Sequence, residues 1–249
     1  MKNILKENER IDDLEYKDLK IIQNKEGFCF GMDSVLLSDF AKEIKEGSKV
    51  VDLGTGTGIL GILLCAKTKL SKIVGVEIQK DVADMAKRSV ILNQLGEKFE
   101  IINQDIKELE LKKGDYDAVV MNPPYKGLDT GLTSEEERKL ISRHEITASL
   151  EDFIKTASDL IKQNGEIYIV HRPERLVDLI FLLRKYHLEP KKMRFVYSKI
   201  NKQPKLFLIK AIKNAKPFLK ISEPLIIYKE DGSYTKELLE IYHKYEKGD

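Results

Sequence analysis

The sequence alternates short apolar segments with longer segments of helical periodicity from residue 49 to residue 183. The strand-like segments are KVVDL (49–53), KIVGVE (72–77), FEIIN (99–103), YDAVVM (116–121) and GEIYIV (165–170). The helical segments span 58–68, 81–95, 150–161 and 176–183, and Asp81 is the expected N-cap of the second. Strands that alternate with helices of roughly ten to fifteen residues are typical of a doubly wound, mostly parallel sheet. We therefore expect an α/β fold.

The segments around this core predict a division of the chain into three parts. Residues 1–45 form an N-terminal arm, a hairpin and a helix from Asp33, packed on the core. Residues 46–215 form the central domain, and residues 216–249 form a C-terminal extension that is part of the same domain. The expected hairpin strands are LKIIQ (19–23) and FCF (28–30). The elements expected toward the C-terminus are two strands within 192–213, a strand at PLIIY (224–228) and a helix from Thr235.

Length and composition exclude several classes of protein. A chain of 249 residues with 42% hydrophobic residues can bury a sizeable core and is long enough for an enzyme. Its longest apolar run, ILGILLCA (59–66), is far shorter than the ~20 residues of a membrane span, and its N-terminus lacks the apolar core of a signal peptide. We therefore expect a cytoplasmic protein. Cys29 and Cys65 lie far apart without metal-ligand spacing, so we expect reduced, buried thiols and no metal.

Residues that could bind a ligand or take part in a reaction lie where the predicted strands end. Ligands of doubly wound sheets bind beyond the carboxyl ends of the strands. DLGTGTG (52–58) ends the first strand, Glu77 the second, Asp105 follows the third and NPPY (122–125) follows the fourth. This coincidence of position indicates a binding site more strongly than any one of the motifs.

A glycine-rich turn follows the first strand of this core. In VVDLGTGTG (50–58), Gly54, Gly56 and Gly58 allow a positive φ and let the backbone approach a ligand closely. A strand-to-helix turn alone would account for one or two of these glycines. Gly56, Gly58 and Gly61 also satisfy the G-x-G-x-x-G pattern of dinucleotide sites, so NAD is a rival ligand.

Acidic residues favour S-adenosylmethionine over NAD as the cofactor. Asp52 would repel a pyrophosphate but suits the cationic methionine end of S-adenosylmethionine. Glu77 can accept both ribose hydroxyls, a feature that NAD sites share. Asp105 can accept a hydrogen bond from the adenine amino group, although a helix N-cap is the alternative role for this residue. Ile78 and Ile106 could then sandwich the adenine ring.

The tetrapeptide NPPY stands out within AVVMNPPYKG (118–127). Its two prolines lock φ and push the preceding residues toward extended conformations, which makes a rigid exit from the strand. A stiff turn explains the prolines. It does not explain Asn122 directly before them and Tyr125 directly after.

These motifs together resemble a known family. DLGTGTG, VEI (76–78), QDI (104–106) and MNPPY, in this order, resemble the class I S-adenosylmethionine-dependent methyltransferases that act on planar amino nitrogens, over roughly residues 48–170. FCFGMDSVLLSDFA (28–41), SRHEITASLEDFIKTAS (142–158) and the closing basic strands are similar to the bacterial tRNA1(Val) (adenine-37-N6)-methyltransferases. The resemblance implies a Rossmann-like, seven-stranded sheet and cofactor contacts from Asp33, Thr55 and Asn122. Met32 stands where that family has a threonine, a departure that concerns the cofactor pocket.

The resemblance also implies a role for each residue of NPPY. The side-chain oxygen of Asn122 and the backbone carbonyl of Pro123 accept the two hydrogens of an adenine amine, so that the nitrogen lone pair points at the methyl group. Pro123 and Pro124 hold these acceptors rigidly. Rigid placement matters because orientation of reactants can recover ~7–11 kcal/mol of the barrier. Tyr125 stacks on the target ring, which needs the ring and not the hydroxyl. No dedicated base is required, so His144 and His171 are expected to be structural or surface residues.

A basic segment near the C-terminus suggests a nucleic-acid partner. Residues 184–220 contain twelve lysines and arginines against Glu189 alone, a net charge of +11. Such a segment is a plausible footprint for a phosphate backbone, here a tRNA, and Lys199, Lys202 and Lys205 are the predicted RNA contacts. Lysine-rich strands that are simply solvated at an edge explain the count equally well.

Other substrates and a non-catalytic role are the alternatives. A protein-glutamine methyltransferase also uses NPPY, but it typically carries a helical N-terminal domain for which residues 1–45 leave no room. A DNA adenine methyltransferase would normally carry a target-recognition domain, and an rRNA base is a further alternative. A nucleotide-binding or NAD-linked module without catalysis has no use for Asn122 and Tyr125.

Overall fold

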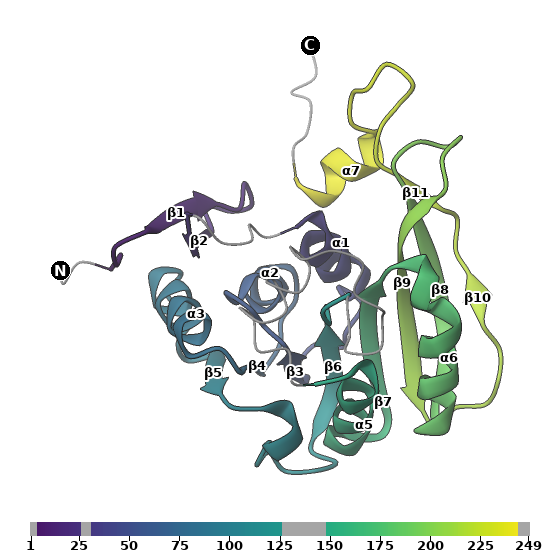
Figure 1. The fold of residues 1–249 in the computed structure, drawn as a ribbon, viewed down its shortest axis with the longest axis horizontal. Helices are drawn as coiled ribbons and strands as arrows, with labels where there is room; N and C mark the ends of the chain where they lie inside the picture. The colour runs from purple at the N-terminus through teal and green to yellow at the C-terminus, as the bar shows by residue number, and fades with distance from the viewer. Residues whose placement is uncertain (1–3, 26–30, 126–147, 244–249) are drawn as a thin grey trace, which may run out of the picture.

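The computed structural model describes residues 4–25, 31–125 and 148–243, and nine strands in these ranges form one sheet. Its strand order is β10-β8-β9-β7-β6-β3-β4-β5, with β11 also paired to β8 (Figure 1). The strands are β3 Lys49–Leu53, β4 Lys72–Glu77, β5 Phe99–Asn103, β6 Tyr116–Met121, β7 Ile161–His171, β8 Leu188–Tyr197, β9 Pro204–Lys213, β10 Lys220–Ile221 and β11 Leu225–Ile226. β9 runs antiparallel to β7 and β8, and every other pairing in the sheet is parallel.

The predicted α/β fold is confirmed. Seven strands have five residues or more, and β10 and β11 add two residues each beside β8. The predicted bounds of β3, β4, β5 and β6 are those of the structure, because each is a short apolar run between polar residues. β7 begins four residues earlier than expected, at Ile161, and its register with β6 shifts between Tyr116 and Ala118.

Helices cover both faces of the sheet. The helices are α1 Met32–Phe40, α2 Ile59–Lys67, α3 Lys80–Leu92, α5 Leu150–Leu160, α6 Leu176–Lys185 and α7 Lys236–Ile241. One core cluster joins α1, α2, α3 and α7 to one face, and a second joins α5 and α6 to the other. Among the described helices, none has the length and apolar character needed to cross a membrane.

The start of α3 differs from the sequence prediction. The N-cap is Gln79, and the helix begins at Lys80. Asp81 lies inside the first turn, so its assignment as the N-cap is wrong. A carboxylate still stabilises the helix there, because it faces the positive end of the helix dipole.

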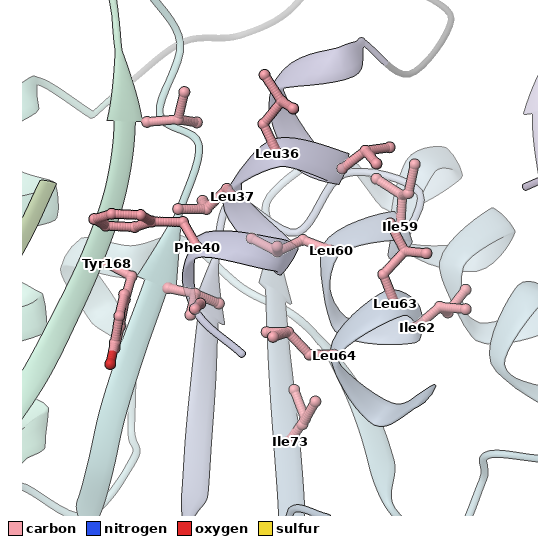
Figure 2. Close-up of a cluster of buried hydrophobic side chains, with 14 of the residues drawn as sticks. Leu36, Leu37, Phe40, Ile59, Leu60, Ile62, Leu63, Leu64, Ile73 and Tyr168 are labelled. Atoms are coloured by element: carbon pink, nitrogen blue, oxygen red, sulfur yellow. The ribbon is translucent and has the colours of Figure 1, made fainter. Parts of the chain in front are cut away.

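Helix α1 packs deep within the first core cluster. Figure 2 shows Leu36, Leu37 and Phe40 of α1 among side chains of α2 and of the sheet. The ring of Phe40 meets that of Tyr168 of β7 edge to face, with centroids 6.1 Å apart. Burial of such side chains stabilises the fold by about 1.5–3 kcal/mol each, so α1 is held firmly at one position over the sheet. The division of the chain at residues 45 and 215 stays a prediction.

A separate two-stranded hairpin lies against α3. β1 Glu9–Asp13 pairs antiparallel with β2 Lys20–Asn24. The expected partner FCF lies outside the described residues, and β1, with sequence ERIDD, was missed because four of its five residues are charged. The hairpin is fastened by side chains of α3: Ser89 Oγ accepts the Ile22 N–H at 2.9 Å, and Arg88 forms an ion pair with Glu9 at 2.6 Å.

Candidate active site

The parallel strands end together at one edge of the sheet. Leu53 of β3 is in register with Val76 of β4 on one side and with Met121 of β6 on the other. The residues that follow, Gly54, Glu77 and Asn122, therefore emerge side by side. The sheet thus brings the glycine turn, the acid and NPPY to one edge, as the strand pattern predicted.

The glycine turn has the backbone conformation expected of it. Gly54, Gly56 and Gly58 have φ angles of 71°, 57° and 91°, a region that residues with a Cβ avoid. A Cβ at Gly56 would meet nothing within 4 Å, so the backbone there borders open space. Gly61 serves another purpose, since its Cβ would lie 2.2 Å from Phe99 Cζ. The third glycine of the dinucleotide pattern is therefore explained by helix-to-sheet packing.

Glu77 ties the end of β4 to this turn. Its carboxylate accepts the Gly56 N–H at 3.0 Å through Oε2 and the Gln79 N–H at 2.9 Å through Oε1. Two backbone donors thus fix a buried carboxylate beside the glycine backbone. A carboxylate held in this way is well placed to receive the hydroxyls of a ribose.

Asp52 is a fully buried acid beneath the turn. Its Oδ2 accepts the hydroxyl of Thr55 at 2.6 Å. Burial raises the pKa of Asp52 to about 7, and the charge of Glu77 acts in the same direction, while the bond from Thr55 opposes it. A bound cation would favour the ionised form of Asp52, because opposite charge lowers the pKa of a carboxyl group.

Asp105 performs the capping role that the sequence left open as an alternative. It is the N-cap of the short helix Ile106–Glu108, and its Oδ1 accepts the Lys107 N–H at 2.9 Å. Ile106 is buried in the core and Ile78 is half-buried. The predicted adenine contacts of these three residues stay predictions.

Asn103 also lies at this site, although it is not among the residues predicted from the sequence. Its Nδ2 donates to the backbone oxygens of Glu77 at 2.9 Å and Ile78 at 2.8 Å. β5 thereby holds the residues expected to face the ribose and adenine. A side-chain amide at the last residue of a neighbouring strand was the available signal.

NPPY leaves β6 and meets the first turn of α1. The Asn122 Nδ2 donates to Ser34 Oγ at 3.4 Å. Because the two ends of an amide diverge, this contact turns the carbonyl oxygen of Asn122 away from Ser34. Pro123 is buried and Pro124 is exposed, so the first proline anchors the segment.

Tyr125 is held at its hydroxyl and around its ring. The hydroxyl donates to the carboxylate of Asp33 on α1. The ring centroid lies 5.2 Å from that of His171 and 5.2 Å from the guanidinium carbon of Arg172. Burial and the charge of Asp33 raise the pKa of Tyr125, so its hydroxyl stays protonated and keeps donating. Neither a role for this hydroxyl nor a contact of Asp33 with Tyr125 was predictable from the sequence, from which Asp33 is expected only in the cofactor pocket.

His171 is a buried packing residue, as predicted. Its ring stacks on Phe207 at 6.4 Å, and its Nδ1 accepts the Arg172 N–H at 2.8 Å. Burial lowers the pKa of His171 to about 4, and the charge of Arg175 adds to this, so the ring is neutral at pH 7. His144 lies outside the described residues, as does Cys29.

The basic segment 184–220 is partly neutralised by acids from elsewhere in the fold. The ion pairs across elements are Lys185–Glu151, Lys192–Glu43, Arg194–Glu237, Lys210–Glu43 and Lys210–Glu166. The local excess of positive charge is therefore smaller than +11. The lysines predicted to bind RNA differ from these, because no ion pair involves Lys202 or Lys205 within the described ranges, while Lys199 Nζ donates to the Glu230 carbonyl at 3.1 Å.

Lys199, Lys202 and Lys205 lie at the same edge of the sheet as NPPY. β8 runs parallel to β6 and β7, so its last residue, Tyr197, is at the carboxyl edge. The turn to β9 follows directly, and Tyr197 is in register with Pro204. The structure thus places these three lysines on the side of the molecule where the candidate active site opens.

Comparisons with known proteins agree with this architecture. The family model of the methyltransferase small domain matches residues 31–185. The tRNA1(Val) (adenine(37)-N6)-methyltransferase of Porphyromonas gingivalis is 28% identical over 92% of this chain and 93% of its own length. The protein of the same name from Flavobacterium johnsoniae is 25% identical over 91% of this chain and 96% of its own length.

Solved structures show the same fold. A predicted O-methyltransferase from Agrobacterium tumefaciens superposes with a TM-score of 0.68 at 22% identity, covering 86% of this chain and 96% of that chain. TYW2 of M. jannaschii, solved in complex with AdoMet, gives a TM-score of 0.58 at 16% identity, covering 84% and 87%. The fold is the Rossmann-like fold of class I methyltransferases. Since the family model covers more than half of the sequence, the chain belongs to the methyltransferase small domain family.

Proposed function

We propose that the protein transfers a methyl group from S-adenosylmethionine to the exocyclic N6 amine of an adenine in tRNA, with adenine 37 of tRNA1(Val) as the target. The observation that carries the proposal is NPPY, braced by α1 at the end of β6 beside the glycine turn. The names of the relatives support the choice of substrate. A tRNA substrate supports a cytoplasmic location.

The residues at the glycine turn fit S-adenosylmethionine. Gly56 leaves open space beside its backbone, Glu77 offers a fixed carboxylate, and Asp52 is a buried acid that a cation would ionise. A pyrophosphate would instead be repelled by Asp52. When bound, the cofactor supplies an electrophilic methyl group on a positively charged sulfur.

The main task of the protein is to orient a weak nucleophile. The lone pair of an adenine amine is delocalised into the ring. Asn122 Oδ1 and the Pro123 carbonyl oxygen accept the two amine hydrogens, which favours a pyramidal nitrogen with its lone pair aimed at the methyl group. Dipoles fixed in advance also stabilise the positive charge that develops on the nitrogen. Ser34 supports this step by holding the opposite end of the Asn122 amide.

The proton leaves without a dedicated base. A methylated amine that still carries its extra proton is strongly acidic, so water accepts the proton. His171 is buried and its Nδ1 accepts a backbone N–H, and Tyr125 keeps its proton because its pKa is raised. Both residues therefore help to position the target base and take no part in proton transfer.

The target base must be out of its stack to reach NPPY. Flipping a base costs a few kcal/mol and least when the base is already unpaired. The ring of Tyr125, backed by His171 and Arg172, supplies a platform for such a base. An adenine in an anticodon loop meets this condition.

Nucleoside analysis of tRNA tests the proposal. Tritiated S-adenosylmethionine, purified enzyme and a tRNA1(Val) transcript should yield N6-methyladenosine, and a transcript with guanosine at position 37 should yield none. tRNA from cells with and without the gene should differ in the same nucleoside by mass spectrometry. Methylation of the guanosine transcript, of double-stranded DNA or of protein glutamine in place of adenine 37 would refute the assignment.

A further inference from the structure

The C-terminal extension places two stacked tyrosines at the edge of the sheet where the active site opens. β11 runs parallel to β8, and Ile226 is in register with Tyr197, the last residue of β8. The Tyr228 N–H then donates to the Ser198 carbonyl at 2.9 Å. The chain beyond β11 therefore continues past the carboxyl edge and lies beside the turn between β8 and β9.

A tight turn builds the tyrosine pair. Tyr228 and Tyr234 form an antiparallel bridge, and the Lys229 N–H donates to the Ser233 carbonyl at 2.8 Å. Gly232 has a φ of 86°, which closes the turn. The two rings stack with centroids 5.2 Å apart and planes 21° apart, and Tyr234 is 42% exposed. The pair is thus exposed to solvent at Tyr234, on a support that is fixed by backbone hydrogen bonds.

The tyrosine pair precedes α7, a helix that packs on α1, and α1 in turn contacts NPPY. After the turn, α7 packs on α1, and Leu238 and Ile241 are buried in the same core cluster as Leu36 (Figure 1). Burial raises the pKa of Tyr242, directly after α7, to about 12, and the charges of Tyr234, Glu15, Asp33 and Tyr228 act in the same direction. Asp33 is the acceptor of the Tyr125 hydroxyl. The tyrosine pair and NPPY thus lie at the same edge of the sheet, the carboxyl edge.

Lysines are frequent in the two segments that meet at the tyrosine pair, and Lys199 Nζ donates to the Glu230 carbonyl within its turn. Residues 197–205 and 228–235 contain four lysines against two acids, Glu230 and Asp231. Asp231 is engaged inside the turn, where its Oδ1 accepts the Ser233 N–H at 2.8 Å and the Ser233 hydroxyl at 2.7 Å. Aromatic rings among cations are the means by which proteins bind unpaired nucleotides: bases stack on the rings and phosphates meet the cations.

We propose that Tyr228 and Tyr234, together with Lys199, Lys202 and Lys229, form a second RNA-binding surface, which stacks an unpaired nucleotide close to the target adenine. The inference rests on the proposed function and extends it to the C-terminal extension. An anticodon loop supplies such a nucleotide, because its bases are unpaired on both sides of the target. The surface would hold the loop while NPPY engages the flipped base.

Substitution of Tyr234 in the full-length enzyme tests this surface. Tyr234→Ala should weaken binding of a tRNA1(Val) anticodon stem-loop by at least about fivefold in fluorescence anisotropy and raise the KM for tRNA to match, with the affinity for S-adenosylmethionine unchanged. Tyr234→Trp should restore binding, because stacking needs a ring. The matched control is Phe218→Ala, an aromatic residue that is 85% exposed between β9 and β10 at the opposite edge, and it should bind RNA as the unaltered enzyme does.

Lys229→Glu leaves both tyrosine rings unaltered and removes one positive charge, so it should also weaken RNA binding. The surface is disproved if Tyr234→Ala and Lys229→Glu melt at the temperature of the unaltered enzyme and bind the stem-loop with unchanged affinity. The proposed function fails separately: RNA binding that depends on Tyr234, in an enzyme that methylates no adenine of the RNA, would retain the surface and reject the activity.

Discussion

The two sides of the candidate active site are held together by different kinds of contact. On the cofactor side, Thr55 bonds to Asp52 three residues away, and Gly56 bonds to Glu77 twenty-one residues away. On the target side, Asn122 bonds to Ser34 across 88 residues, and Tyr125 bonds to Asp33 across 92. The cofactor side is thus built within two consecutive strand–helix units, and the target side requires an element from far earlier in the chain.

This difference shows how each side depends on the fold. The glycine turn takes its shape from its own residues and from the neighbouring strand. NPPY takes its final shape from α1, which occupies its position because Leu37 and Phe40 are buried against the sheet and α2. Changes that affect the target side should therefore leave cofactor binding intact, and the reverse should hold as well.

The largest expected effect belongs to Asn122 on the target side. Asn122→Ala should lower kcat by about 100- to 1000-fold, the usual effect of removing one group that stabilises charge in the transition state. Cofactor affinity should fall far less than kcat, and the melting temperature should change little. Single-turnover methylation of tRNA measures the rate of transfer, calorimetry with S-adenosylmethionine measures the cofactor affinity, and a thermal melt measures the stability. Asn214→Ala at the opposite edge is the control, and a folded, fully active Asn122→Ala enzyme would falsify the catalytic role.

The next effect is a pH dependence on the cofactor side. The pKa of Asp52 is raised from 3.8 to about 7, and a cationic cofactor prefers the ionised form. Affinity for S-adenosylmethionine should therefore fall about tenfold between pH 8 and pH 6, in proportion to the ionised fraction. Calorimetry at several pH values measures this, and Asp52→Asn should bind weakly with no such dependence. A flat profile in the unaltered enzyme would remove Asp52 from the cofactor site.

The same carboxyl group should make the cofactor-free protein less stable as the pH rises, whereas the cofactor affinity should increase with pH. Because the folded-state pKa exceeds the ordinary value, Asp52 contributes stability that is fully present below pH 3.8 and is lost as the pH rises through about 7. Cofactor binding should offset this loss. Thermal melts of the enzyme and of Asp52→Asn with and without S-adenosylmethionine compare the two trends.

A smaller effect is expected from the contact between Tyr125 and Asp33. Tyr125→Phe removes the hydroxyl and keeps the ring. It should lower kcat/KM for tRNA by about tenfold, because a hydrogen bond to a charged group contributes about 1.5–3 kcal/mol. The double variant Tyr125→Phe with Asp33→Asn should be no worse than the more impaired single variant. If Asp33→Asn weakens cofactor binding while Tyr125→Phe does not, Asp33 serves the cofactor pocket and the two sides share a residue.

The smallest effect concerns the turn between β8 and β9. Lys202→Glu with Lys205→Glu should flatten the dependence of tRNA affinity on salt by about one unit of slope for each lost phosphate contact. Affinity for the cofactor should not change. Lys216→Glu, an exposed lysine at the opposite edge, is the matched control. Equal slopes for both variants would return these lysines to a solvated edge.

The basic segment shows where counting residues misleads. The count of +11 treats residues 184–220 as isolated, whereas Glu43, Glu151, Glu166 and Glu237 approach it from other elements. These ion pairs join residues that are far apart in the sequence, so a count along one segment does not reveal them. The lysines that we propose to contact RNA are distinguished by their position, since Lys202 and Lys205 lie at the edge of the sheet where NPPY lies.

The sequence by itself determined the strand–helix units, the left-handed glycine turn and the position of NPPY at a strand end. Apolar periodicity and the restrictions of glycine and proline are local properties, so they can be read from neighbouring residues. Only the tertiary structure decided that Asp33 and Ser34 contact NPPY, that β1 is the partner of β2, and that Tyr234 lies at the same edge of the sheet as NPPY. These contacts join residues whose own surroundings carry no signal of each other, because burial of α1, α3 and α7 against the sheet brings them together.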